Sequence, residues 1–124
     1  MRIVNKKEFL ALPNNTVYSK YSKTGNIEGL YIKTDTWEND WIYENLISCI
    51  DCFDTGEFFD ICTKAESDSK YEFKLDLYCT ERDGCFDQND LFMIYSNIEV
   101  KNLINKLQEV FSSFREEDTI NYDI

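Results

Sequence analysis

Carboxylates dominate the residues of this chain that could do chemistry. Its 124 residues include 24 Asp and Glu, five Cys and no His. The absence of His removes the commonest general base, the commonest metal ligand and every His-dependent triad. The four Gly do not cluster, and no P-loop, GxGxxG or GxSxG motif occurs. The sequence therefore predicts no catalytic site and no phosphate-binding loop, and we expect a protein that is not an enzyme.

The cysteines raise the question of a metal or redox site. Cys49-Ile50-Asp51-Cys52 has the spacing of half a zinc knuckle or of a redox pair. A complete zinc site needs a second pair, and Cys79 and Cys85 are irregularly spaced, six residues apart. Free Cys is among the most buried residue types, and an odd number of Cys without a signal-peptide-like N-terminus is typical of the cytosol. We expect five reduced cysteines, no metal and no cofactor.

A group of carboxylates lies within residues 81–90. Asp87-Gln88-Asn89-Asp90 has some likeness to an oxygen-ligand loop for Ca²⁺ or Mg²⁺. The spacing of Asp83, Asp87 and Asp90 does not match the EF-hand pattern, and no twelfth-position Glu follows. The pattern favours a solvated turn at Asp83-Gly84, with a metal-dependent hydrolase as the alternative left open.

The charge is unevenly distributed along the chain. Residues 1–33 hold two acids and six bases, whereas residues 34–124 hold 22 acids and seven bases, and the whole chain has a net charge of −11. Between Thr34 and Thr63 there are eight acids and no base. Such a surface repels phosphate backbones and attracts basic proteins, although it also serves solubility. We expect a basic protein partner and no direct contact with nucleic acid.

Aromatic residues lie within the same acidic stretch. Exposed Trp and Tyr among acids are typical of interface hot spots, and packing in the core is the other interpretation of Trp37, Trp41 and Tyr43. Of these three we expect Trp37 at the surface. The predicted partner-binding residues are carboxylates of this stretch and of the 81–90 segment, together with this Trp: Asp35, Trp37, Glu38, Asp40, Glu44, Asp83, Asp87 and Asp90.

Three helix starts carry the same local signal, a capping box with a hydrophobic staple. The cap and its acid lie three residues apart each time, and the last helix shows a clear 3.6-residue apolar stripe. The pairs are Asn5 and Glu8, Asp54 and Glu57, and Ser96 and Glu99, and helices are expected over about 6–12, 55–65 and 97–114.

Between the helices an apolar period of two predicts strands. They are expected over 16–21 and 29–33, joined by a hairpin at Thr24-Gly25-Asn26, and over 41–50, 71–79 and 91–95, with a helix as the alternative for 41–50. The order α-β-β-β-α-β-β-α favours one α+β domain over residues 1–124, with a mostly antiparallel sheet of about five strands and the helices largely on one face. No apolar run is long enough to span a membrane, and the acidic tail 115–124 is expected to fray.

Several short strings of residues occur together along most of residues 8–107. They are Phe9-Leu10…Leu12-Pro13, Thr16-Val17-Tyr18-Ser19-Lys20-Tyr21, Ile32-Lys33, Asn39-Asp40…Tyr43, Arg82-Asp83-Gly84…Phe86-Asp87 and Leu91-Phe92…Tyr95. In these strings the chain resembles short proteins of phages and prophages in low-GC Gram-positive bacteria, although Asn15 stands where that family has Gly. The resemblance carries no established activity. It implies the bacterial cytoplasm and the class of small acidic inhibitors of bacterial defence, including anti-CRISPR proteins.

These observations lead to a function hypothesis and two alternatives. The protein is expected to inhibit a defence factor, such as a CRISPR nuclease, by occupying its basic nucleic-acid-binding surface. An immunity protein against a nuclease toxin would use the same physics. A binder or sponge for a nucleotide signal, using Lys20, Lys23 and Lys33, is the alternative from another class.

Overall fold

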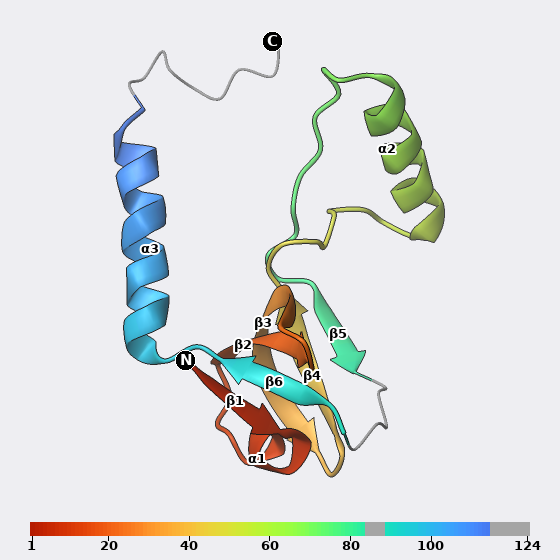
Figure 1. Ribbon diagram of the computed structural model, residues 1–124. Coiled ribbons are helices and arrows are strands. Elements are labelled where there is room, and N and C mark those ends of the chain that lie inside the picture. Colours follow the sequence, from red (N-terminus) through yellow and green to blue (C-terminus); the bar gives the residue numbers. More distant parts are fainter. Residues whose placement is uncertain (84–88, 115–124) are drawn as a thin grey trace.

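A computed structural model of the protein describes residues 1–83 and 89–114, with Asp83 described by its backbone alone. The expected α+β class and antiparallel sheet are confirmed. In chain order the described elements are β1 (Arg2–Asn5), α1 (Lys6–Leu10), β2 (Thr16–Ser22), β3 (Asn26–Trp37), β4 (Asp40–Asn45), α2 (Thr55–Ser67), β5 (Thr80–Asp83), β6 (Leu91–Ile94) and α3 (Asn97–Ser112) (Figure 1).

The six strands form one sheet in the order β1-β6-β2-β3-β4-β5, and all neighbours are antiparallel. The sequence predicted about five strands and a helix as the first element. Two strands of the sheet were not predicted, β5 and β1; in β1 Val4 is the one buried residue and lies opposite Phe92 of β6. Four residues are too few to show an apolar period of two, so β1 can be recognised only from its pairing with β6.

The three predicted helix starts are confirmed. The side chains of Asn5, Asp54 and Ser96 each accept a hydrogen bond from the backbone N–H three residues on, at 2.8, 2.8 and 3.3 Å. At α1 the box is complete, because the Glu8 carboxylate accepts from the Asn5 backbone N–H at 3.2 Å. Each helix ends within two residues of its predicted end, because these caps and stripes are local properties of the chain.

The buried core lies between α1 and one face of the sheet. Phe9 is fully buried, and its ring centroid lies 4.7 Å from that of Tyr18, 4.9 Å from that of Trp41 and 4.1 Å from that of Phe92. Trp41 Nε1 donates to the Tyr18 hydroxyl at 2.9 Å, so this polar pair is satisfied inside the core. The short helix α1 therefore closes this face with a single large aromatic side chain.

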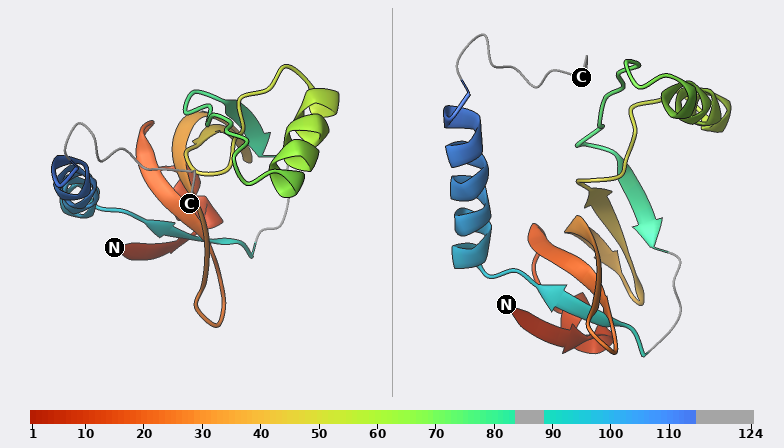
Figure 2. Two further views of the ribbon diagram at one scale, coloured as in Figure 1. Left: turned by 90° about the horizontal axis from the view of Figure 1, so that it is seen from above. Right: turned by 45° about the horizontal axis from the view of Figure 1, so that its top comes forward.

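The other two helices do not cover the sheet, so the prediction that the helices lie largely on one face is wrong. Figures 1 and 2 show α2 and α3 rising away from the sheet, whereas α1 lies against it. Ile61 is the one buried residue of α2, and α3 has none. None of the described helices combines the length and apolar character that a bilayer crossing requires.

Residues 46–79 leave the sheet after β4 and return just before β5, and we call this segment the α2 lobe (Figure 1). The strand predicted over 71–79 is wrong. This segment pairs through one isolated β-bridge, between Leu75 and Ile50, at the base of the lobe. Leu75 alone of residues 71–79 forms a bridge and residues 77–78 form a turn, so the segment pairs locally with residues 49–51 instead of joining the sheet.

The base of the α2 lobe is held by three connections. The Asp51 N–H donates to the Lys74 carbonyl and the Asp76 N–H donates to the Cys49 carbonyl, both at 2.8 Å. A disulfide joins Cys49 to Cys79, with their Cα atoms 6.5 Å apart. The expectation of five reduced cysteines is therefore wrong for this pair. The two residues are 30 positions apart in the sequence, so no local spacing reveals the bond.

Candidate functional site

Part of the predicted binding surface lies at the turn between β3 and β4, and we call residues 35–40 the hairpin tip. Glu38 adopts a left-handed backbone (φ 51°), which lets Trp37 and Asp40 pair directly across a tight turn. Trp37 is 55% exposed, as expected, whereas Trp41 is fully buried in the core. The guanidinium carbon of Arg82 on β5 lies 5.9 Å from the Trp37 ring centroid, within cation–π range.

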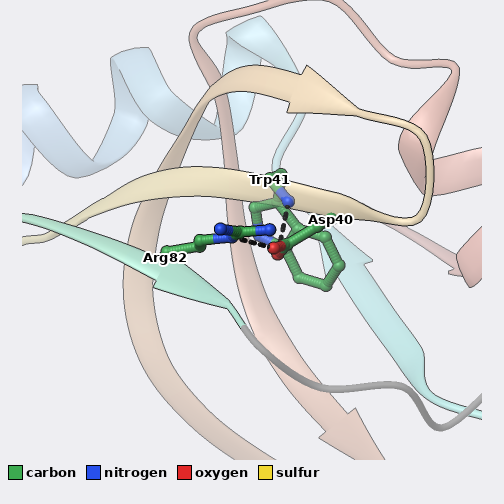
Figure 3. Close-up of polar contacts among 3 residues, drawn as sticks. All are labelled: Asp40, Trp41 and Arg82. Carbon is green, nitrogen blue, oxygen red and sulfur yellow. Dashed lines mark hydrogen bonds and ion pairs between the residues drawn. The ribbon is translucent and has the colours of Figure 1, made fainter.

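Asp40 was predicted to contact a partner, but it is buried and already paired (Figure 3). Its carboxylate accepts from Arg82 Nε and, at 2.8 Å, from the backbone N–H of Trp41. Burial by itself raises the pKa of this carboxyl, but the hydrogen bonds from Arg82 and Trp41 and the Arg82 charge outweigh burial and hold the pKa below its usual range. Asp40 therefore fixes β4 to β5 and offers no free charge to a partner.

The structure separates the other predicted residues. Asp35 is exposed at the hairpin tip and accepts from Asn14 Nδ2 at 3.2 Å. Glu44 is half-buried on β4, opposite Ile32 and Thr80 in the sheet register. The remaining three predictions fall elsewhere: Asp83 ends β5, Asp90 is half-buried just before β6, and Asp87 and the Asp83-Gly84 turn lie outside the described residues.

The acidic stretch from Thr34 to Thr63 does not form a single surface. Its first acids lie at the hairpin tip, at the lower end of the sheet in Figure 1, and its last acids lie in the α2 lobe at the upper end. β4 runs between them, six residues or about 20 Å of extended chain. The acids of this stretch therefore belong to two separate surfaces, the hairpin tip and the α2 lobe.

The α2 lobe surface combines exposed carboxylates with exposed aromatic side chains. Phe53 is 90% exposed and Phe59 is 62% exposed. Neither was predicted as a site residue. Phe59 lies off the helix stripe formed by Phe58, Ile61 and Ala65, and this offset is the sequence signal that could have identified it. The acids of the same surface are exposed and form no ion pair with any described residue: Asp51, Asp54, Glu57 and Asp60.

The cysteines of the lobe do not form the redox pair that the Cys49-x2-Cys52 spacing allows. Cys49 is bonded to Cys79, and Cys52 is a free thiol. Burial and the neighbouring carboxylates, Glu57 first among them, raise the pKa of Cys52, so its thiolate fraction at neutral pH is small. The sulfurs of Cys49 and Cys79 lie within 4.8 Å of an Asp76 carboxylate oxygen, but the disulfide occupies both sulfurs and leaves one oxygen donor.

Two of the lysines proposed for a nucleotide signal, Lys33 and Lys20, are poorly placed to bind one. Lys33 is buried, and its Nζ donates to the Leu12 carbonyl at 2.7 Å. Burial lowers the pKa of this ammonium. Lys20 lines a cavity of about 230 Å³, but Glu28 and Asp90 line the same cavity. Two carboxylates beside one ammonium are unfavourable for a phosphate.

Comparisons with models of protein families, with characterised proteins and with solved structures find no match for this chain. The exposed carboxylates and aromatic side chains of the α2 lobe and the hairpin tip are therefore the features from which a function can be inferred.

Proposed function

We propose that the protein is an acidic binding protein that docks the α2 lobe, with the hairpin tip as a second contact, onto a basic protein surface. Phe53 carries the proposal, because a 90% exposed aromatic side chain stands next to Asp51 and Asp54. Exposed aromatics flanked by charge are typical of interface anchors, and carboxylates around them steer a cationic partner.

The phage resemblance gives this partner a class. In a phage setting the basic surface belongs to a bacterial defence factor such as a CRISPR nuclease, and the protein inhibits it by excluding the nucleic acid. The net charge of −11 supports this mode, because a nucleic-acid-binding groove is the commonest strongly basic surface on a nuclease.

Binding to a purified CRISPR nuclease from a low-GC Gram-positive bacterium tests the proposal. We expect target DNA to compete with the protein, and we expect the affinity to fall steeply as salt is added. Phe53→Ala and the double reversal Asp51→Lys with Asp60→Lys should each weaken binding by at least about 10-fold, the scale of an interface hot spot. Asp54 and Glu57 are left intact because Asp54 caps α2 by binding the Glu57 N–H.

Two further variants locate the contact. The reversal of Asp35 and Glu38 to Lys measures how much the hairpin tip contributes to the affinity for the nuclease. Glu28→Lys reverses one charge at the far end of β3; it is the control for the single reversal Glu38→Lys and should leave affinity nearly unchanged. Binding that ignores salt, or that coexists with bound DNA, would contradict the proposal. Tight binding to a nuclease toxin in place of the CRISPR enzyme would favour the immunity-protein alternative.

A further inference from the structure

The sheet has a second face that no described helix covers, and this face is apolar. Residues two apart along a strand share a face, so the side chains that alternate with the core residues point away from α1. Ile3 and Ile27 on this open face are 51% and 54% exposed. Its other aliphatic side chains and Met93 are half-buried and come from the strands β2, β3 and β6: Val17, Ile32, Leu91 and Met93. The strand register also places Ser19, Tyr21 and, on β4, Glu44 on this face. A solvated sheet face is normally polar, so an apolar one indicates a covering layer.

The same chain carries a helix that lacks a surface to pack on. α3 has 16 residues and no buried residue. Leu107 is 60% exposed and Phe111 is 74% exposed. Isolated helices of this length are marginal in water even when they are rich in Ala, and α3 contains several β-branched residues and Asn. Its stability therefore requires contact with another apolar surface.

The shape of the α3 stripe fits a sheet better than a second helix. Val100, Leu103, Leu107 and Val110 follow the narrow 3-4-3 spacing of a two-helix seam, but Ile104 and Phe111 widen it on one side. A stripe of this width is typical of a helix that covers a broad surface. α3 also holds two acids and two bases in a chain of net charge −11, so its contact with an equally acidic molecule avoids repulsion.

The connection between β6 and α3 keeps the helix away from its own sheet. It consists of Tyr95 and Ser96, and both are held in place. The Tyr95 N–H donates to the Val17 carbonyl at 3.0 Å, and its hydroxyl lies 2.8 Å from Ser19 Oγ. The Ser96 side chain caps α3 by accepting from Glu99 N–H. A helix that starts from a fixed two-residue connection and rises from the sheet, as in Figure 2, is placed to reach another molecule.

We propose that two copies of this chain form a symmetric dimer in which α3 of each copy lies across the open apolar sheet face of the other. The exchange is isologous, so it closes after two copies and leaves neither surface exposed. α3 is about 24 Å long, and two equivalent helix-on-sheet contacts bury on the order of 1,600 Å² in total, the size of a standard stable interface. Pairing of the two α3 helices alone would bury about half of that area and would leave both sheet faces exposed.

The mass in solution tests this inference and does not depend on any nuclease. We expect wild-type protein at micromolar concentration to sediment as a dimer, at twice the chain mass of 14.7 kDa. Leu107→Glu places a charge in the α3 contact and should raise the dimer dissociation constant about 100-fold or more. Asn105→Glu is the matched control, because it adds the same charge to the polar side of α3 and should leave the dimer intact.

Ile3→Glu separates a helix-on-sheet contact from a helix-on-helix one. This substitution changes the open sheet face alone, and we expect it to dissociate the dimer as well. An equimolar mixture of the Leu107→Glu and Ile3→Glu chains should then form a heterodimer, because it retains one unaltered α3 and one unaltered sheet face that match. A heterodimer would show that both variant chains still fold, so misfolding would not explain why each variant alone fails to dimerise. A monomeric wild type, a dimer that survives Leu107→Glu or Ile3→Glu, or a mixture that stays monomeric would overturn the proposal.

Discussion

Asp40, the last residue of the hairpin tip, carries a buried negative charge, and its role is to join two strands. It is 7% exposed, and its carboxylate binds Arg82 of β5 and the start of its own strand. A buried carboxylate without these donors would be strongly unfavourable, so the ion pair and the strand pairing depend on each other. The exposed Trp37 ring lies against the same Arg82, which places the tip on a rigid base.

The charge of Asp40 makes part of the stability pH-dependent. Because the folded-state pKa of Asp40 is lowered, the ionised carboxylate contributes stability above its unfolded pKa of about 3.9. This contribution disappears as the pH falls through the lower folded pKa. We expect Asp40→Asn to reduce the free energy of unfolding by about 1–2 kcal/mol at pH 7 and to have progressively less effect as the pH falls below about 3.9 and through the folded pKa. Urea titrations across this range measure the difference.

The exposed Asp35→Asn is the control for that experiment and should change stability little at any pH. A destabilisation by Asp40→Asn that does not decrease as the pH falls below about 3.9 would show that Asp40 acts through packing and not through its charge.

Gly29 is the glycine whose backbone the fold requires most. It lies in β3 at φ 74°, and a Cβ there would meet the Tyr31 ring at 2.3 Å. The ring cannot move freely, because it lies between Tyr18 and Tyr43 at centroid distances of 5.3 and 5.1 Å. We expect Gly29→Ala to destabilise the fold by about 2–4 kcal/mol, the sum of left-handed strain and overpacking. Chemical denaturation measures this change.

Gly25 provides the matched comparison for Gly29. It has a similar φ of 80° in the β2–β3 turn, but a Cβ there would meet nothing within 4 Å. Gly25→Ala should therefore cost only the backbone strain, about 1 kcal/mol. Equal costs at the two glycines would mean that the contact with Tyr31 relaxes without penalty.

At the scale of elements, the parts that the sequence predicted are those with local causes. The helix starts at Asn5, Asp54 and Ser96 follow from capping contacts between residues three positions apart. The β2–β3 turn follows from Thr24-Gly25. Each of these needs no knowledge of the rest of the fold, so a single sequence was sufficient.

The missed features all depend on distant partners. The period-two pattern of residues 71–79 predicts a strand, but it does not reveal which segment that strand pairs with. In the structure these residues pair with residues 49–51 at the base of the α2 lobe. The Cys49–Cys79 bond spans 30 positions, and Lys33 is buried because the Leu12 carbonyl reaches its ammonium from outside the strand. Of the candidate site, Trp37 at the surface was predicted correctly, whereas the burial of Asp40 required the position of β5.

The α2 lobe depends on its disulfide more than the sheet does. Within the lobe Ile61 is the one residue of α2 that is buried, and two backbone hydrogen bonds and the bridge of Ile50 with Leu75 close its base. Closing a loop of about 30 residues by a disulfide contributes about 3.6 kcal/mol, and we expect most of it to act on the lobe. Replacing Cys49 and Cys79 by Ser should lower amide-exchange protection in α2 about 100-fold and leave β2 and β3 protected.

Cys62→Ser is the control, since this half-buried thiol is free. If α2 keeps its protection without the Cys49–Cys79 bond, the lobe is held by its other contacts, and Phe53 remains a rigid anchor under reducing conditions.

At the scale of the whole molecule, the net charge of −11 acts oppositely on the two proposed contacts. A basic partner is attracted, and a second copy is repelled. Raising NaCl from about 0.1 to about 1 M shortens the screening length from about 10 to about 3 Å. The complex with a basic nuclease should therefore weaken, whereas the dimer through the apolar stripe of α3 and the open sheet face should tighten.

Sedimentation for the dimer and equilibrium binding for the nuclease measure both trends in the same buffers. Leu107→Glu supplies the control, since a chain that cannot dimerise should stay monomeric at both salt concentrations and still lose nuclease affinity with salt. Opposite trends require that acids and apolar residues occupy separate surfaces, as the hairpin tip and α2 lobe are separate from α3 and the open sheet face. A dimer that dissociates in salt would mean that ion pairs hold the two copies together, and the apolar exchange of α3 would then be wrong.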